Sequence, residues 1–357
     1  MKSLGNFPDP FLAEIAGQPD ALRRAATALV ERRPELERIR DAGASARTLV
    51  FTGMGSSYDA CYPAVNDLAG RGVPSILVDT AELLHFRRPI LTPQTLLTIV
   101  SQSGESAEIV KLAVEISKQR ARPVVLSITN GLANDLAKRS DITLDTSAGP
   151  ETGPSTMTFA AAMTQLLAVA RLLAGDSVDT AVDRTRTAAE SAALAMERLL
   201  DDPEGYAAQL EDWFGHKEIT VVLGRGPARA AAEMGALFLK ECGVMAESLE
   251  SAAFRHGPLE LAGPNMAAIV LATEPETRRL DLGLAADLVE AGASVLVITP
   301  DGEAPKGAHA VATGYQDRAL VSAVSILPVQ LLAWKRAVSS GRAPGIYTRA
   351  SKVTTRE

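Results

Sequence analysis

A cluster of residues suited to phosphate binding stands at Ser101-Gln102-Ser103-Gly104-Glu105-Ser106. It follows an apolar run over 96–100 and precedes a helical pattern over 107–118. A hydroxyl-rich turn between a buried strand and a helix start favours an anion, because backbone N–H groups and serine hydroxyls can both donate to it. The same residues also suit an ordinary helix start, with Ser103 or Ser106 as the cap. The stretch therefore predicts a phosphate site or a simple cap.

A second glycine-rich loop, Gly53-Met54-Gly55-Ser56-Ser57, also follows a predicted strand and opens a helix. Tyr58 stands where a dinucleotide-binding fingerprint needs its third glycine, which disfavours that function. The loop instead predicts a tight turn that places Ser56 and Ser57 at the carboxyl edge of a sheet, where open α/β folds bind ligands. Because the Ser101–Ser106 loop ends a strand of the same predicted sheet, the two loops together predict a sugar-phosphate site.

The elements that position these loops alternate between short β-branched runs and longer Ala/Leu-rich helical patterns. This alternation is typical of α/β folds, in which helices flank a parallel sheet. Helical patterns fill the gaps, and a long one over 180–200 joins two halves of the chain. The predicted strands cover 48–52, 74–78, 96–100, 123–128, 141–144, 218–223, 266–272, 294–299 and 308–312.

The two halves resemble an internal repeat. The segment Val50-Phe51-Thr52-Gly53-Met54-Gly55 is similar to Val221-Val222-Leu223-Gly224-Arg225-Gly226, and one offset also relates later strands of the halves. The halves differ where the chemistry lies, because the second has Ala272-Thr273-Glu274 in place of Ser101-Gln102-Ser103. A carboxylate at Glu274 would repel phosphate, so we expect one anion site, in the first half.

Composition sets further limits on the protein. The 357 residues suffice for two domains, and a net charge of −7 without a basic patch predicts no nucleic-acid partner. We expect no metal or other cofactor, since Cys61 and Cys242 lack metal-type spacing. Both cysteines are expected to be buried, and two free cysteines suit a reducing cytoplasm. No signal peptide and no membrane-spanning run are expected.

Taken in order, these motifs resemble the double SIS-domain (sugar isomerase) family. The likeness is to the isomerase half of glucosamine-6-phosphate synthase and to related SIS-type glucosamine-6-phosphate deaminases. It implies two tandem SIS domains, each a flavodoxin-like three-layer sandwich, at 46–175 and 176–338. A helical segment over 1–45 precedes them, and a tail over 339–357 covers the active site. Further matching pieces are Glu14–Arg23, Ala148-Gly149-Pro150-Glu151, Ser155-Thr156, Leu239-Lys240-Glu241, His256-Gly257-Pro258-Leu259 and Ser351-Lys352-Val353-Thr354.

The resemblance implies a role for each matching residue. Glu241 would move a proton between C1 and C2, His256 from a neighbouring subunit would open the sugar ring, and Lys352 would close over the bound sugar. Glu247 is a second carboxylate that could bind substrate or replace the base. The residues implied to hold the sugar phosphate are Ser57, Ser101, Gln102, Ser103 and Ser106, and Ser56 stands beside Ser57 in the same loop.

The resemblance is incomplete: Phe238 and Met157 stand where the synthase has lysines, and Ala253 stands where it has an acid. No glutaminase half is expected, because that half would need an N-terminal cysteine nucleophile and the chain begins Met1-Lys2-Ser3. The resemblance implies a cytoplasmic homodimer that isomerises and deaminates a 6-phosphorylated amino sugar. A simple aldose–ketose isomerase, a dehydratase, a ketosamine-cleaving enzyme and a non-catalytic sugar-phosphate sensor stay open.

Overall fold

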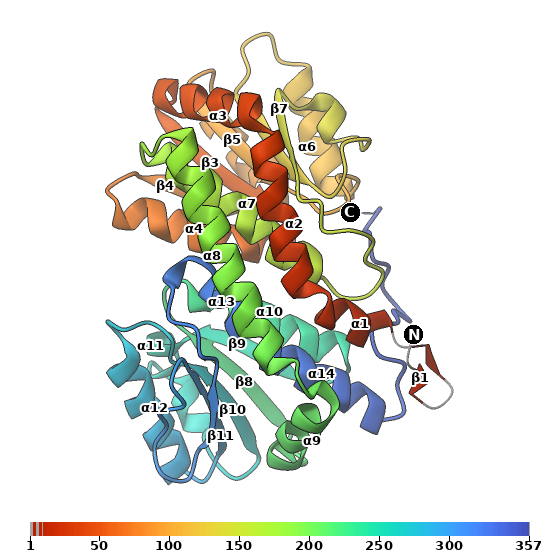
Figure 1. Cartoon of the computed structure of the whole chain (residues 1–357), viewed down its shortest axis with the longest axis vertical. Helices are drawn as coiled ribbons and strands as arrows, with labels where there is room; N and C mark the ends of the chain where they lie inside the picture. Colours follow the sequence, from red (N-terminus) through yellow and green to blue (C-terminus); the bar gives the residue numbers. More distant parts are fainter. Residues whose placement is uncertain (1–2, 5–6, 9, 357) are drawn as a thin grey trace. The chain divides into compact units, whose positions relative to one another are not determined.

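Two five-stranded parallel sheets form the framework of this computed structural model, which describes residues 3–4, 7–8 and 10–356 (Figure 1). The first has the strand order β4-β3-β5-β6-β7 and the second β12-β11-β10-β8-β9. Numbered along the chain, both orders read 2-1-3-4-5, which is the flavodoxin-like arrangement. The predicted α/β fold with two repeated parallel sheets is therefore confirmed.

The sheets use residues close to those expected. The first contains β3 Thr48–Gly53, β4 Ser75–Asp79, β5 Thr95–Val100, β6 Val124–Thr129 and β7 Ile142–Asp145. The second contains β8 Ile219–Gly224, β9 Ala246–Glu250, β10 Met266–Leu271, β11 Ser294–Thr299 and β12 His309–Ala312. A separate antiparallel pair joins β1 Ser3–Leu4 to β2 Phe7–Pro8. Within each large sheet every adjacent pair is parallel.

The strand β9 was not predicted from the sequence. Its five residues include three polar ones, Glu247, Ser248 and Glu250, and only Ala246 is buried. β9 lies at the edge of its sheet and pairs with β8 alone. An edge strand with little burial needs no continuous apolar run, and such a run was the signal used for the other strands.

The chain divides into two compact units, each built around one sheet. The N-terminal sheet unit comprises Asp20–Glu151, Ser155–Glu190 and Thr348–Glu357. The C-terminal sheet unit comprises Met1–Pro19, Thr152–Pro154 and Ser191–Tyr347. The last residues of the chain thus belong with the sheet that carries the serine loops.

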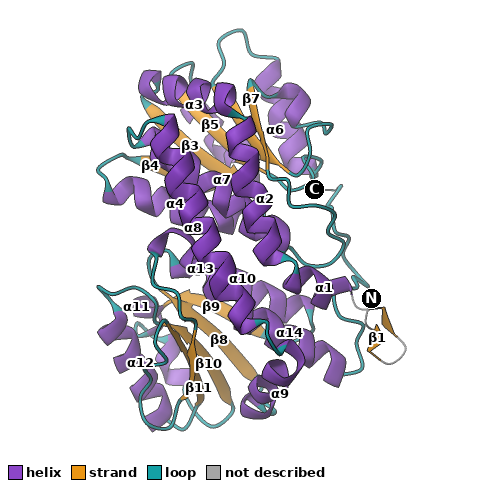
Figure 2. Cartoon of the chain, in the orientation of Figure 1, coloured by secondary structure: helices purple, strands orange, loops and turns teal. Residues whose placement is uncertain are grey.

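Helices cover both faces of the N-terminal sheet (Figure 2). Side chains at alternate positions of the central strands, among them Val50, Leu97 and Ile99, pack with the α6 residues Ile109 and Leu112. The opposite face is covered by α4 and α7, which also pack on each other. The helical segments associated with this unit are α2 Gln18–Glu31, α3 Arg33–Ser45, α4 Ser56–Gly70, α5 Thr80–Glu82, η1 Leu83–Arg87, η2 Arg88–Ile90, α6 Ala107–Ser117, η3 Ala137–Arg139, α7 Met157–Leu173 and α8 Val178–Leu199.

The C-terminal sheet repeats this layering. Val221, Val270 and Val295 pack with Leu284 and Leu288 of α12 on one face. On the other face α10 packs against β8, α13 and α14. The helical segments here are α1 Pro10–Ala16, α9 Pro203–Phe214, α10 Ala228–Glu241, α11 Ser251–Phe254, η4 Pro258–Leu261, α12 Arg278–Glu290, η5 Arg318–Leu320, α13 Val321–Ser325 and α14 Leu327–Ser339.

One helical stretch, Arg318–Ser339, is long and apolar enough to cross a membrane by length and composition. The expectation that no apolar run reaches such a length is therefore wrong. However, 83% of its apolar window is buried inside the protein. The stretch includes α14, which packs against α9 and α10, so its apolar surface is already covered by protein.

Candidate functional site

The neighbouring strands β3 and β5 carry the two serine loops at their carboxyl ends. In the order β4-β3-β5-β6-β7, the chain moves outward in opposite directions from these two strands. Such a switch point leaves a crevice beyond the strand ends, and ligands of open α/β sheets bind there. The Gly53–Ser57 and Ser101–Ser106 loops therefore stand where the fold itself favours a ligand.

Gly53 allows α4 to begin immediately after β3. A Cβ atom at this position would lie 2.8 Å from the Ser57 carbonyl carbon and 2.8 Å from the Tyr58 nitrogen. Gly55 follows with a φ of 51°, in the left-handed region that favours glycine. Ser56 and Ser57 are therefore the first two residues of α4, where backbone N–H groups have no partner within the helix.

The Ser101–Ser106 loop is shaped by its own hydroxyls. The Gly104 N–H donates to Ser101 Oγ and the Glu105 N–H donates to Ser103 Oγ, both at 3.1 Å. Ser106 is the residue before α6, but its side chain makes no capping hydrogen bond. Ser101 and Ser103 thus stabilise the turn, while each hydroxyl retains a proton to donate. The simple-cap interpretation fails for Ser106.

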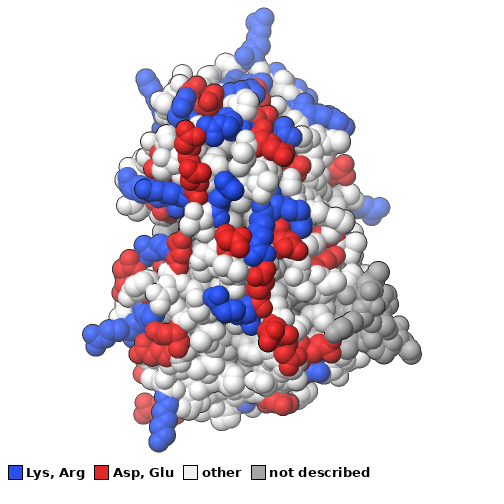
Figure 3. All heavy atoms as spheres, viewed as in Figure 1, with Lys and Arg blue, Asp and Glu red and all other residues white. Residues whose placement is uncertain are grey.

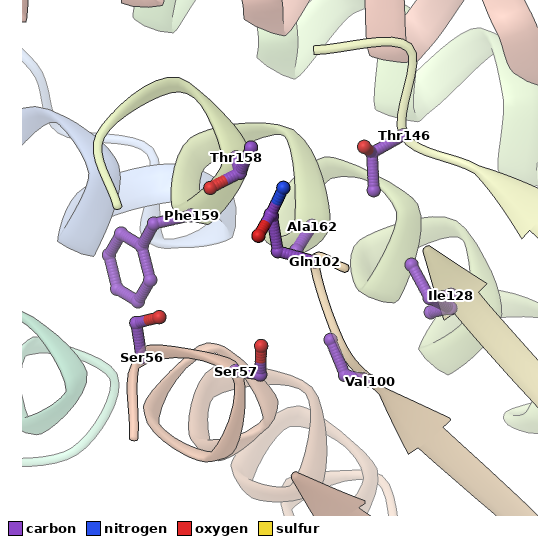
Figure 4. Close-up of a pocket in the computed structure, with 9 residues that line it drawn as sticks. All are labelled: Ser56, Ser57, Val100, Gln102, Ile128, Thr146, Thr158, Phe159 and Ala162. Atoms are coloured by element: carbon purple, nitrogen blue, oxygen red, sulfur yellow. The ribbon is translucent and has the colours of Figure 1, made fainter. Parts of the chain in front are cut away.

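A pocket lies between the two loops and the first turn of α7 (Figure 4). Of the predicted substrate-binding residues, Ser56, Ser57 and Gln102 line it. Figure 4 shows Gln102 between Ser57 and Thr158, with polar atoms of all three directed toward the same space. Ser101, Ser103 and Ser106 are not among the lining residues, and Ser101 is only 4% exposed. The remaining lining residues are Val100, Ile128, Thr146, Thr158, Phe159 and Ala162.

Asn130, which was not predicted, connects three loops of this site. Its backbone N–H donates to the Gln102 carbonyl at 3.0 Å. Its side-chain oxygen accepts bonds from Thr146 Oγ1 and the Ala148 N–H, both at 3.1 Å, and its amide nitrogen donates to the Gly149 carbonyl at 2.8 Å. Its position two residues after the predicted strand 123–128 of the same sheet was the available sequence signal.

The tail residue Lys352 belongs to the same unit. Its Nζ lies 2.7 Å from Glu151 Oε2 and 3.4 Å from Ser155 Oγ. The Thr354 carbonyl accepts a hydrogen bond from the Ala107 N–H, at the start of α6. The tail thus contacts both the segment before α7 and the residue that follows the Ser101–Ser106 loop.

Glu241, Glu247 and His256 lie in the C-terminal sheet unit. Glu241 is the last residue of α10 and is exposed, and the Tyr347 hydroxyl donates to its Oε1 at 3.3 Å. Glu247 is exposed in β9 and lies 3.6 Å from Lys240 Nζ. His256 is exposed in the turn after α11. The meeting of these residues with the serine loops stays a prediction.

Ion pairs occupy the corresponding switch point of the C-terminal sheet. Glu274 follows β10, is 3% exposed and accepts a 2.7 Å bond from Arg318. Asp281 accepts a 2.8 Å bond from Arg225, which follows β8. Burial raises the pKa of Glu274 and of Asp281, although the arginine bonds oppose this rise. At this edge of the C-terminal sheet, carboxylate–arginine pairs therefore stand where the first half has its serine loop.

Neither cysteine suits nucleophilic chemistry. Cys61 and Cys242 are buried free thiols, as expected from the sequence. Burial raises the pKa of Cys61, and it raises the pKa of Cys242 to about 12. Because the thiolate is the reactive form, both side chains are inert near neutral pH.

The SIS domain family model matches residues 44–172 and 216–339, so the chain belongs to the SIS domain family. A glutamine–fructose-6-phosphate aminotransferase (isomerizing) of Pyrobaculum aerophilum is 28% identical over 361 residues, covering 100% of this chain and 59% of the relative. The enzyme of the same name from Aeropyrum pernix is 30% identical over 373 residues, covering 99% and 58%. The chain thus spans less than two thirds of the length of these relatives.

Solved structures share the fold across nearly the whole chain. The C-terminal domain of glucosamine-fructose-6-phosphate aminotransferase from Francisella tularensis matches with a TM-score of 0.82 at 23% identity, covering 95% of this chain and 98% of that one. Tagatose-6-phosphate ketose/aldose isomerase from Escherichia coli has a TM-score of 0.78 at 24% identity, covering 94% of each. Glucosamine-6-phosphate deaminase from Thermotoga maritima has a TM-score of 0.73 at 20% identity, covering 97% and 99%. At these identities the likeness establishes the fold.

Proposed function

We propose that this protein is a cytoplasmic enzyme that acts at C1–C2 of a 6-phosphorylated amino sugar, releasing ammonia and a ketose phosphate. The observation that carries the proposal is the pocket at the switch point, where Ser56, Ser57 and Gln102 converge in an SIS-family fold. Relatives and structural neighbours are named for fructose 6-phosphate, tagatose 6-phosphate and glucosamine 6-phosphate. A hexosamine 6-phosphate agrees both with these names and with the hydroxyl and amide side chains that line the pocket.

The proposed reaction begins with ring opening assisted by His256. Glu241 then takes the proton from C2 of the open-chain amino sugar and returns it to C1, while a proton passes from the amino group to O1. These transfers convert the 2-amino aldose into the 2-imine of a ketose. Water adds to the imine carbon and ammonia leaves, so one sugar phosphate and one water give one ketose phosphate and one ammonia. The exposed position of Glu241 at the end of α10 leaves its carboxylate accessible to a substrate.

The test is a panel of hexose and hexosamine 6-phosphates assayed for both ammonia and ketose. Glucosamine 6-phosphate should release ammonia, and Glu241→Gln should lower turnover by about 10²–10⁴ with little change in binding. Glu247→Gln is the matched control, because it removes a second exposed carboxylate close in sequence. Loss of turnover in Glu247→Gln with retention in Glu241→Gln would reassign the base.

The same panel separates the alternatives. Ketose formation without ammonia would indicate a simple aldose–ketose isomerase. Binding with no turnover of any sugar phosphate would indicate a regulator, and formation of a dehydrated or cleaved product would indicate the remaining enzyme classes. Each outcome other than ammonia release contradicts the proposed deamination.

We further propose a homodimer in which His256 of one subunit completes the serine site of the other. An isologous pair supplies two such sites at once. Subunits carrying His256→Ala should regain part of the activity when exchanged with subunits carrying Ser101→Ala and Ser103→Ala, because one heterodimer site keeps every residue. No recovery after verified exchange, or a monomer by light scattering, would refute the shared site.

A further inference from the structure

Glu151 is a fully buried carboxylate at the start of α7. Its side chain is 0% exposed, and both oxygens accept several bonds. Oε1 accepts from the Thr156 N–H at 2.8 Å, the Thr156 hydroxyl at 3.1 Å and the Thr158 N–H at 3.1 Å. Oε2 accepts from the Thr158 hydroxyl at 2.5 Å and from Lys352 Nζ at 2.7 Å.

The charge of Glu151 requires compensation, because a buried carboxylate is costly unless it is paired and hydrogen-bonded. The N–H groups at the start of α7 offer partial positive charge. Lys352 supplies the full opposite charge, and its side chain is itself only 19% exposed. Most residues around Lys352 in the tail are exposed, so this ion pair is a specific attachment of the tail.

This attachment reaches the pocket through one residue. Thr158 donates to the same Glu151 oxygen that accepts from Lys352, and Thr158 also lines the pocket (Figure 4). The nearby tail residue Thr354 accepts a hydrogen bond from the Ala107 N–H. Glu151 therefore connects the tail lysine to the pocket wall, while Thr354 connects the tail to the first residue of α6.

We propose that Glu151 is a positioning residue that holds the Lys352 ammonium against the pocket wall and keeps the C-terminal tail closed on the N-terminal sheet unit. The proposal deepens the proposed function, on which the closing of Lys352 over the bound sugar rests. The holding itself is a property of the folded chain, with the Glu151–Lys352 ion pair as its charged contact. It can therefore be measured without any substrate.

The first experiment measures trypsin cleavage after Lys352 by intact-protein mass spectrometry. Glu151→Gln keeps the size of the side chain but removes its charge, so cleavage should accelerate about tenfold or more with the loss of a charge-assisted bond. The matched control is Glu14→Gln. Glu14 is a second buried carboxylate, and it accepts bonds from Thr152 and Gly153, which lie between Glu151 and α7. Its described hydrogen bonds include none from a lysine. Its cleavage rate should stay within about twofold of the wild-type rate.

A second measurement covers the case in which Glu151→Gln disturbs the start of α7. Lys352→Met leaves Glu151 with all its threonine partners and removes only the ammonium. Hydrogen exchange of the Ala107 amide should accelerate about tenfold in this variant, because a released tail withdraws the Thr354 carbonyl. The double variant should exchange no faster than either single variant, since both changes break one interaction.

Wild-type exchange at Ala107 in the Lys352→Met variant would overturn the proposal, as would equal tail cleavage in Glu151→Gln and Glu14→Gln. With an active substrate, Glu151→Gln should lower kcat about tenfold while KM changes less than about threefold. A change in KM alone would contradict a positioning role. If no sugar phosphate is turned over by the wild type, the proposed function fails, whereas the trypsin and exchange results still decide the role of Glu151.

Discussion

Gly104 offers a sharp test of the phosphate-loop geometry. Its φ is 64°, and a Cβ atom added there would lie 2.0 Å from Oδ1 and 2.3 Å from Cγ of Asn134. Asn134 is only 6% exposed, and it donates to the Gly131 carbonyl at 2.8 Å and accepts from the Ala137 N–H at 2.9 Å. Alanine at this position therefore forces either the loop or a bonded, buried asparagine to move.

The cost of Gly104→Ala follows from two contributions. A left-handed conformation costs a non-glycine residue roughly 1–2 kcal/mol. Displacing Asn134 removes two hydrogen bonds, together worth about 1–3 kcal/mol. The variant should therefore lose about 2–5 kcal/mol in the free energy of unfolding, measured by urea titration, if the loop keeps its shape.

Gly72→Ala is the matched control, because Gly72 has a φ of 76° and nothing within 4 Å of an added Cβ. Gly72→Ala should therefore lose only the roughly 1–2 kcal/mol that a left-handed conformation costs a non-glycine residue. In an Asn134→Ala background the extra cost of Gly104→Ala should largely vanish, since the two closest atoms are gone. Equal costs for Gly104→Ala and Gly72→Ala would refute the reasoning, as would full additivity with Asn134→Ala. Calorimetry with glucosamine 6-phosphate should show weaker binding for Gly104→Ala and none of this loss for Gly72→Ala.

Three further substitutions test separate parts of the molecule. Asn130→Ala removes three side-chain hydrogen bonds behind the pocket and should weaken sugar-phosphate binding about tenfold or more in calorimetry; unchanged affinity would contradict its connecting role. Partial burial raises the pKa of Asp141, but hydrogen bonds and nearby positive charge, led by the bond from Arg122, together outweigh it and keep this pKa below its ordinary 3.8. The pair therefore stabilises the fold above pH 3.8, and the stabilisation is lost as pH falls through the lower pKa of the folded state. Asp141→Asn should therefore be less stable than the wild type at pH 7 in thermal unfolding, with the gap closing below about pH 4; a gap that is the same at both pH values would refute this. Tyr347→Phe removes the bond to Glu241 and should lower turnover about threefold to tenfold with unchanged affinity, whereas a loss of affinity alone would place the tyrosine in binding.

The sequence predicted the central strands closely, because β5 and β10 carry continuous apolar runs and are buried along their whole length. Strand β5 has all six residues buried and was located within one residue at its start. The edge strand β9 was missed for the opposite reason, since its polar residues interrupt any apolar run and only Ala246 is buried. Surface charge likewise carried little information about the site: Figure 3 shows Lys and Arg interspersed with Asp and Glu over one face, as the net charge of −7 and the scattered bases lead us to expect.

For the site, local patterns in the sequence located residues that act near the ends of strands, whereas distant residues such as Lys352 were named only through the family resemblance. Ser57 and Gln102 lie within four residues of the ends of the neighbouring parallel strands β3 and β5, so the sheet alone places them at one edge. Thr158 reaches the same pocket from α7, and no periodicity in the chain relates it to the serine loops. Glu151 could be recognised as part of a motif, but its partner Lys352 lies 201 residues further along the chain, and only the folded tail joins the two. The residues hardest to predict are therefore those whose role is to hold others, because their function is a contact and contacts between distant segments leave no local pattern in the sequence.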